Sequence, residues 1–252
     1  MPSSRTPEPS PKIIAGAAVG WRAEAWQRMR AHFVLKTLGI SAFMALFFVG
    51  YFHVLRHPAH AVTTMPLIAL DHWVGFEPDA LAAYVSLWVY VGIAPGLLRT
   101  LRELVVYGLW AAALCLAGLA CFYFAPTAVP PSGLNLAGYP GFALLQGVDA
   151  AGNACPSLHV ATAMFSAVWI DRLLRELRAA PVLRGVNAGW CLLIAWSTMA
   201  TRQHVALDVL AGAALGLAFA APSLRWRPRG NAARGRRGAR LSSILPAGGR
   251  GE

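Results

Sequence analysis

Apolar residues in this chain gather into runs long enough to cross a lipid bilayer. A helix rises about 1.5 Å per residue, so roughly 20 apolar residues span the ~30 Å of hydrocarbon. Because lipid offers no water to satisfy backbone N–H and C=O groups, such runs must be helical. The sequence therefore predicts an all-α, polytopic membrane helix bundle with about six transmembrane helices. The expected spans are 37–55, 79–98, 103–125, 157–174, 183–200 and 204–222.

Composition supports the membrane class. Hydrophobic residues make up 57% of the chain and charged residues 13%, against roughly 25% charged residues in an ordinary soluble domain. Four spanning helices are the alternative, if two of the segments are re-entrant. The fifth and sixth segments are separated by a very short stretch around residues 201–203, which predicts a tight antiparallel pair.

The positive charges predict the orientation. If both termini are cytoplasmic, only Arg56 and Arg202 of the 22 Lys and Arg residues fall outside. This asymmetry follows the positive-inside rule for cytoplasmic loops. We therefore expect a multi-pass protein of a bacterial-type inner (plasma) membrane, with both termini cytoplasmic and the opposite face toward the periplasm.

Three regions are expected. Residues 1–36 form a basic cytoplasmic arm, in which Trp21 to Phe33 is predicted to be an interfacial amphipathic helix. Residues 37–222 form the six-helix membrane domain, and residues 223–252 form an Arg-rich tail with a composition typical of disorder. The net charge of +11 also fits nucleic acid, but without a folded soluble module membrane lipids are the favoured partner. Oligomeric state stays open.

Two histidines and one aspartate carry the candidate chemistry. His159 lies at the start of the fourth span and His204 at the start of the sixth, and Asp208 follows His204 by one helical turn. Ionisable groups at membrane depth are expensive and tend to be functional. A carboxylate fixes the tautomer of a neighbouring imidazole, and helix N-termini bind anions. The alternative is a structural role, with packing histidines and an aspartate that complements a helix dipole.

Other residues receive local interpretations. Thr201 is expected to cap the sixth helix, and Gly212 with Gly216 is expected to mediate close helix packing. Four cysteines without a Cys-x-x-Cys unit give no support for a metal site. Whether Cys121 and Cys155 pair at the outer face is left open.

The stretches from Asn153 to His159 and from Ser197 to Asp208 resemble two known signatures. They are similar to the second and third motifs of the type 2 phosphatidic acid phosphatase superfamily, which includes vanadium haloperoxidases and bacterial acid phosphatases. Leu158 stands where many members have glycine, a form closest to the branch that contains inositol phosphorylceramide synthases. The resemblance covers roughly residues 80–220.

The resemblance implies a mechanism. His159 protonates the leaving group, His204 attacks phosphorus to give a phosphohistidine, and Asp208 orients His204. It implies neither a metal nor another cofactor. Ser157 is implied to help hold the phosphate oxygens, and Thr201 and Arg202 are further candidates for phosphate binding.

The first motif of the superfamily, with its Lys and Arg, is not recognisable in this chain. The third motif often carries Arg six residues before its histidine, where this sequence has Thr198. Arg202 lies one turn further on and is the preferred substitute. The long outer segment 126–156, with Tyr139, Phe142 and Leu144-Leu145, is expected to be either a lid over the site or a passive linker.

The sequence is compatible with three classes of function. The favoured one is a membrane phosphatase that hydrolyses a lipid phosphate at the outer face. The second is a phosphotransferase that passes a lipid phosphoryl headgroup to an alcohol. The third is a non-enzymatic membrane protein, either a haem-binding protein with two axial histidines or an inactive scaffold.

Overall fold

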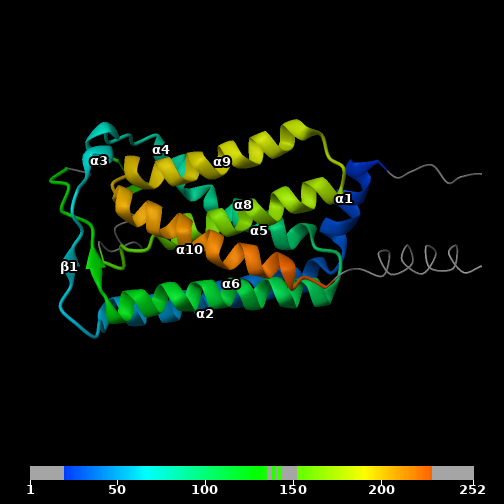
Figure 1. Cartoon of the computed structure of the whole chain (residues 1–252), viewed down its shortest axis with the longest axis horizontal. Coiled ribbons are helices and arrows are strands. Elements are labelled where there is room, and N and C mark those ends of the chain that lie inside the picture. Colours follow the sequence, from blue (N-terminus) through cyan, green and yellow to red (C-terminus); the bar gives the residue numbers. More distant parts are fainter. Residues whose placement is uncertain (1–19, 135–137, 140, 143–151, 229–252) are drawn as a thin grey trace, which may run out of the picture.

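The protein is a bundle of long helices that run side by side along one axis (Figure 1). The computed structural model describes residues 20–134, 138–139, 141–142 and 152–228. The bundle confirms the expected all-α class. Its helices are α2 (Phe33–Arg56), α4 (Ala80–Val85) and the α5 (Leu87–Leu97) that continues it, α6 (Leu101–Phe124), α8 (Leu158–Glu176), α9 (Pro181–Ala200) and α10 (Ala206–Arg225).

Four segments are long and apolar enough to cross a membrane: α2, Ala80–Leu97, α6 and α10. Helices α8 and α9 have 19 and 20 residues, which also suffices in length. Helix α8 lies against α5, α6, α9 and α10, so little of its surface can face lipid and its composition can be more polar. A membrane-spanning role for α8 and α9 stays a prediction.

The second expected span is broken at Ser86, between α4 and α5. The Ser86 hydroxyl donates to the carbonyl of Ala83 at 2.6 Å and accepts a hydrogen bond from the Trp190 indole at 2.8 Å. This polar anchor ties the break to α9. Tyr84 of α4 and Trp88 of α5, on either side of the break, both contact the same histidine, His159.

The two ends of the bundle differ in construction (Figure 1). At one end, here called the strand end, β1 (Thr63–Thr64) pairs in parallel with β2 (Thr127–Ala128), and the short α3 (Ala69–Trp73) lies close by. At the opposite end lies α1 (Trp21–Arg30), a helix within the predicted segment Trp21 to Phe33, and its interfacial position stays a prediction. We call this second end the α1 end. The remainder of the expected basic arm and tail, 1–19 and 229–252, lies outside the described residues.

Helix α10 packs mainly on α8 and only slightly on α9. The expected tight pair of the fifth and sixth segments is therefore wrong. The reason is that Gly212 and Gly216 have no side chains, which lets α10 approach α8 closely. A Cβ on Gly212 would lie 2.3 Å from the Ser157 carbonyl oxygen, and one on Gly216 would lie 2.4 Å from that of Ala161. The expected packing role of both glycines is confirmed.

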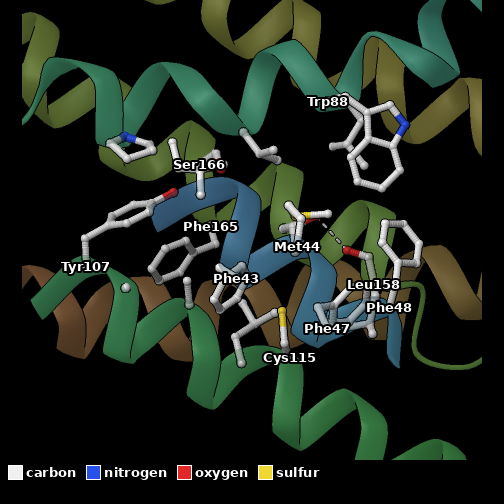
Figure 2. A pocket seen from close by; sticks show the side chains of 18 of the residues that line it. Phe43, Met44, Phe47, Phe48, Trp88, Tyr107, Cys115, Leu158, Phe165 and Ser166 are labelled. Atoms are coloured by element: carbon white, nitrogen blue, oxygen red, sulfur yellow. Dashed lines mark hydrogen bonds between the residues drawn. The ribbon is translucent and has the colours of Figure 1, made fainter. Parts of the chain in front are cut away.

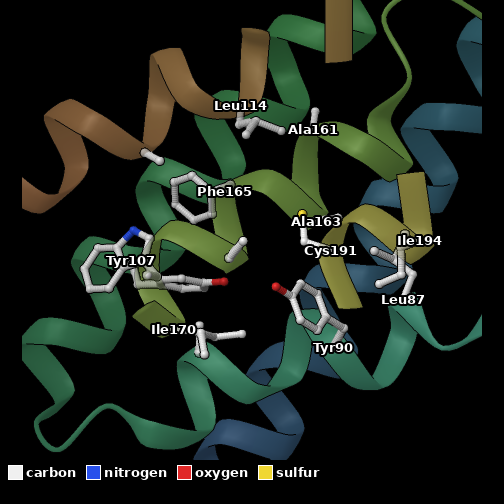
Figure 3. Packing of buried hydrophobic residues seen from close by; sticks show 14 of the residues in the cluster. Leu87, Tyr90, Tyr107, Leu114, Ala161, Ala163, Phe165, Ile170, Cys191 and Ile194 are labelled. Atoms are coloured by element: carbon white, nitrogen blue, oxygen red, sulfur yellow. The ribbon is translucent and has the colours of Figure 1, made fainter. Parts of the chain in front are cut away.

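Helix α8 lies at the centre of the core, among side chains of α5, α6, α9 and α10 (Figure 3). Polar groups in this core are paired. The Tyr90 hydroxyl donates to the Asn187 side chain at 2.7 Å, and the Trp169 indole donates to the Ser223 hydroxyl at 2.8 Å. Buried polar groups need such partners. The first bond joins α5 to α9 and the second joins α8 to α10, while the Asn187 amide donates to the Ala167 carbonyl at 2.9 Å and so joins α9 to α8. A rigid α8 positions the residues at its first turn.

Candidate active site

His159 occupies the first turn of α8 at the strand end. The helix begins at Leu158, after the N-cap Ser157, whose hydroxyl accepts a hydrogen bond from the Val160 amide at 3.3 Å. The His159 ring stacks on Tyr84 with centroids 4.4 Å apart and meets the Trp88 ring nearly edge-on at 6.0 Å. An imidazole between two aromatic rings has a fixed orientation. A protonated imidazole over an aromatic face also gains cation–π stabilisation.

His204 lies in the linker between α9 and α10, two residues before α10 begins. Its backbone amide donates to the Thr198 carbonyl at 3.0 Å, and its side chain is only 9% exposed. Its Nδ1 lies 3.5 Å from Oδ2 of Asp208, a residue with no exposed surface. That separation is longer than a hydrogen bond, and Nδ1 makes no other hydrogen bond. Oδ2 also accepts a hydrogen bond from the Val205 amide at 3.0 Å.

The two histidines face one site. Their ring centroids are 6.1 Å apart, and both side chains line the same cavity. The Ser157 amide donates to the Asp208 carbonyl at 2.9 Å, which joins the start of α8 directly to the first turn of α10. The structure therefore brings His159, His204, Asp208 and Ser157 together, although Asn153 to His159 and Ser197 to Asp208 are separate stretches of sequence.

Thr201 does not cap α10, contrary to expectation. It follows the last residue of α9, and its hydroxyl donates to the Ser197 carbonyl at 2.7 Å. The N-cap of α10 is Val205, and the carboxylate of Asp208 binds the amide there. The reason is that five residues, not three, connect the helices, so Thr201 closes the first one. Thr201 is buried beside the histidine segment.

Arg202 lies in the same linker, with backbone φ of 60° and a half-exposed side chain. It does not line the cavity that contains the two histidines, whereas its neighbour Gln203 does. The Gln203 amide donates to the Thr201 carbonyl at 3.3 Å. Arg202 is thus adjacent to the site and would have to extend its side chain toward a bound phosphate.

Asp71 is a member of the site that the sequence reasoning missed. Its buried carboxylate accepts a hydrogen bond from the Ala206 amide at 2.7 Å and another from the Ile68 amide at 2.8 Å. Ala206 is the first residue of α10, so Asp71 of α3 holds the backbone directly after His204. The sequence gives only a weak signal, because Asp71 is a single acid in the five-residue helix α3, 135 residues from Ala206.

Tyr84 was also missed, as an aromatic residue within an apolar run. It belongs to a small buried cluster with Phe142, against which Phe76 and Leu81 pack. Phe142 comes from the long outer segment, so part of that segment belongs to the same cluster as the ring on which His159 stacks. The expected lid residues Leu144 and Leu145 lie outside the described residues, and a lid stays a prediction.

Cysteine chemistry does not contribute to the site. Cys121 and Cys155 are both free thiols. Burial raises the pKa of the Cys155 thiol to about 11, so it is protonated and weakly nucleophilic at neutral pH. Across the described parts of the chain, no three His, Cys, Asp or Glu side chains are grouped so as to hold a metal ion.

Comparison with known families is consistent with this geometry. The family model described as the PAP2 superfamily matches residues 38–232, which include every helix from α2 to α10 in large part or whole. No curated protein and no solved structure matches the chain. The finer likeness to the inositol phosphorylceramide synthase branch stays an expectation.

Proposed function

Because the chain belongs to the PAP2 superfamily, we propose that it is a membrane phosphatase that hydrolyses a lipid phosphate at the outer face of the membrane through a phosphohistidine intermediate. Membership supports chemistry of the phosphatase or phosphotransferase type. The observation that carries the finer proposal is the burial of the His204–Asp208 pair across one cavity from His159.

His204 is the proposed nucleophile. Its Nδ1 lies on the side of the Asp208 carboxylate, which leaves Nε2 as the nitrogen that attacks phosphorus. A carboxylate that accepts the Nδ1 proton in a hydrogen bond fixes this tautomer and stabilises the positive charge that develops on the ring. The first step forms an N–P bond and breaks the P–O bond to the lipid.

His159 is the proposed general acid. It donates a proton to the leaving lipid oxygen as the P–O bond breaks. In the second step it accepts a proton from the water that attacks the phosphohistidine, which releases inorganic phosphate and restores His204. The stacked Tyr84 ring fixes the plane of the imidazole that carries this proton.

The phosphate oxygens need donors. Backbone amides at the first turn of α8 and the Ser157 hydroxyl form one group of candidates, since a helix N-terminus favours anions. Arg202 supplies the second group, whereas the buried Thr201 hydroxyl already donates to the Ser197 carbonyl at 2.7 Å. A guanidinium is suited to the paired oxygens of a phosphate.

Substitution of the two histidines tests the proposal. We expect His204→Ala to abolish both phosphate release and acid-labile labelling by a radioactive lipid phosphate. The rate of hydrolysis by His159→Ala should fall ~10²–10⁴-fold for a lipid phosphate and much less for an aryl phosphate, whose leaving group needs no proton.

Phosphate release by wild-type purified protein, with and without an added alcohol, separates hydrolysis from transfer. Full activity of His204→Ala would refute the assignment of His204 as the nucleophile. A haem absorption band in the purified protein would favour the alternative of a haem-binding protein.

A further inference from the structure

Apolar side chains in this bundle form the core (Figure 3), line the cavity that contains the two histidines (Figure 2), or lie on the outer faces of the long helices. Three exposed apolar residues, Leu67, Leu70 and Trp73, have none of these positions. They lie in α3 or just before it, in the connection between β1 and α4. Trp73 is 83% exposed, the largest fraction among the large apolar side chains of the described residues. We call these three residues the α3 stripe.

Helix α3 has one exposed side and one buried side. Successive residues of a helix are ~100° apart, so Leu70 and Trp73 lie toward one side and Asp71 toward the other. Burial agrees with this geometry, since Asp71 is buried whereas the other four residues of α3 are exposed. Leu70 and Trp73 therefore face away from α10, to which Asp71 is hydrogen-bonded.

Two hydrogen bonds fix the level of α3 along the bundle. Asp71 accepts a hydrogen bond from the amide of Ala206 at 2.7 Å, and Ala206 is the first residue of α10, a candidate membrane span. The Glu77 amide donates to the carbonyl of Ala200, the last residue of α9, at 3.0 Å. A bilayer adds ~5–8 Å of headgroups on each side of its ~30 Å of hydrocarbon. A helix that is bonded directly to the first residue of a span lies within such a layer.

The exposed side of α3 has the chemistry of a membrane-interface anchor. It carries no Lys, Arg, Asp or Glu. Tryptophan is enriched where headgroups meet hydrocarbon, because its ring is apolar and its N–H is polar. On α9, Leu193 and Trp196 are exposed, and Trp196 precedes Ala200 by about one turn. The predicted lipid-facing surface of α9 thus reaches the level at which α3 lies.

A second copy of the chain is a weaker candidate for the partner of the α3 stripe. A stable protein interface buries ~800 Å² on each side. The stripe consists of one tryptophan, which buries ~150–250 Å², and two smaller leucine side chains, so it supplies only part of that area. Lipid headgroups need no matching surface and can cover an apolar stripe of any size. The lipid surface is therefore the favoured partner.

We propose that the α3 stripe inserts into the lipid surface at the strand end of the bundle, and that this contact holds Asp71 against the start of α10. The partner is the headgroup layer of the leaflet nearest the two histidines. The inference goes beyond the proposed function, since it names no reaction and holds for either orientation of the chain in the membrane. Because Ala206 follows His204 by two residues, α3 links the bilayer to the backbone of the proposed nucleophile.

Photocrosslinking tests the contact with lipid. The full-length protein, in nanodiscs of phosphatidylcholine and phosphatidylglycerol, carries the photoreactive residue p-benzoylphenylalanine in place of Trp73. We expect covalent lipid adducts at this position after irradiation. The same replacement of Leu46, which is 74% exposed in α2, is the positive control. Adducts of position 73 to a second copy or to another segment of the chain, or no lipid adduct where position 46 forms one, would overturn the proposal.

Hydrogen exchange tests the link to α10. In the double variant Leu70→Ser/Trp73→Ser, the Ala206 amide should exchange at least fivefold faster than in the wild type in the same nanodiscs. Trp73→Phe keeps an apolar ring and should exchange like the wild type. Trp26→Ser is the matched control, because Trp26 is a 62% exposed tryptophan of α1, at the opposite end of the bundle.

The outcomes of these two measurements are separable. Equal exchange of Ala206 in the double variant and the wild type would refute the link to α10, and so would equally faster exchange in Trp26→Ser. Neither measurement requires turnover of a phosphate. An inactive protein that still forms lipid adducts at position 73 would refute the proposed function alone.

Discussion

Arg202 has a backbone conformation that arginine adopts only at a cost. Its φ of 60° lies in the left-handed region, which costs a non-glycine residue about 1–2 kcal/mol. Such strain is concentrated at functional sites. Since Arg202 is next to Gln203 and His204, we interpret it as a phosphate ligand that is drawn in by substrate. The alternative is a side chain that extends to lipid headgroups at the turn.

Arg202→Lys separates these two roles. A lysine extends to headgroups as well as arginine does, so activity would be retained in that case. A ligand that makes two parallel hydrogen bonds to phosphate cannot be replaced by an ammonium, and kcat/KM should fall about 10–100-fold, since a charged hydrogen bond contributes ~1.5–3 kcal/mol. Arg178→Lys is the matched control, because Arg178 also has positive φ, at 54°, but lies after α8, far from its first turn. Wild-type kcat/KM in Arg202→Lys would leave phosphate binding to the helix N-terminus.

Tyr84 is expected to act through the His159 ring. The ring face contributes ~0.5–2 kcal/mol to an imidazolium, so Tyr84→Leu should slow hydrolysis of a lipid phosphate about 2–30-fold. Hydrolysis of an aryl phosphate, which needs no general acid, should change less. Tyr84→Phe keeps the stacked ring and should retain most activity. Equal losses with both substrates in Tyr84→Leu would indicate a purely structural role for the ring.

At the scale of elements, α10 is fixed at its start by two carboxylates. Asp208 binds the Val205 amide from within the helix, and Asp71 binds the Ala206 amide from α3. Both amides directly follow His204, so its backbone is held by neighbours on either side of the helix boundary. Asp71 is therefore a positioning residue for the proposed nucleophile.

Asp71→Ala should reduce kcat more than it changes KM. The variant leaves the buried Ala206 amide without an acceptor, which costs about 1–3 kcal/mol. A cost of this size at the transition state corresponds to a roughly 5–150-fold fall in kcat. The rate of phosphohistidine formation in a single turnover is the decisive measurement. Asp71→Asn retains a carbonyl oxygen and should recover part of the rate. Asp79→Ala, at an exposed acid before α4 that makes no capping bond, is the control. A change in KM alone would argue against positioning.

Local sequence rules were sufficient for the helices and for part of the site. Apolar runs locate the helices because lipid requires helical hydrogen bonding, and one-turn spacing places Asp208 beside His204. The helix partners were not predictable in the same way. The short linker suggested that α10 packs on α9, but Gly212 and Gly216 make α8 the closer partner.

Residues that join the site through long-range contacts were missed. Asp71 accepts a hydrogen bond from an amide 135 residues away, and Tyr84 of α4 stacks on His159 of α8. Neither contact leaves a periodic pattern in the sequence. The cavity was missed for a similar reason, since the residues that line it are the same apolar types that face lipid.

At the scale of the whole molecule, a charged network closes the α1 end of the bundle over the last residues described. At the α1 end Arg227 binds Glu103 of α6 at 2.7 Å and Glu176 of α8 at 2.7 Å, and its guanidinium lies 5.6 Å from the Trp169 ring centre. This network joins the chain after α10 to α6 and α8. It places an arginine of the expected cytoplasmic tail at the end opposite to the histidines.

Both termini are accordingly predicted to be cytoplasmic, with the histidines facing outward. A reporter fused after Glu252 should report the cytoplasm, and one inserted between residues 132 and 150 should report the outside. Cys121 is an independent readout, since it is exposed in the last turn of α6 at the strand end. A membrane-impermeant thiol reagent should label it in intact cells, whereas the buried Cys115 in the same helix stays unlabelled. Labelling of Cys121 only after permeabilisation, together with inverted reporters, would place the histidines in the cytoplasm. The substrate phosphate would then have to be presented from the inner leaflet, against the charge asymmetry of the chain.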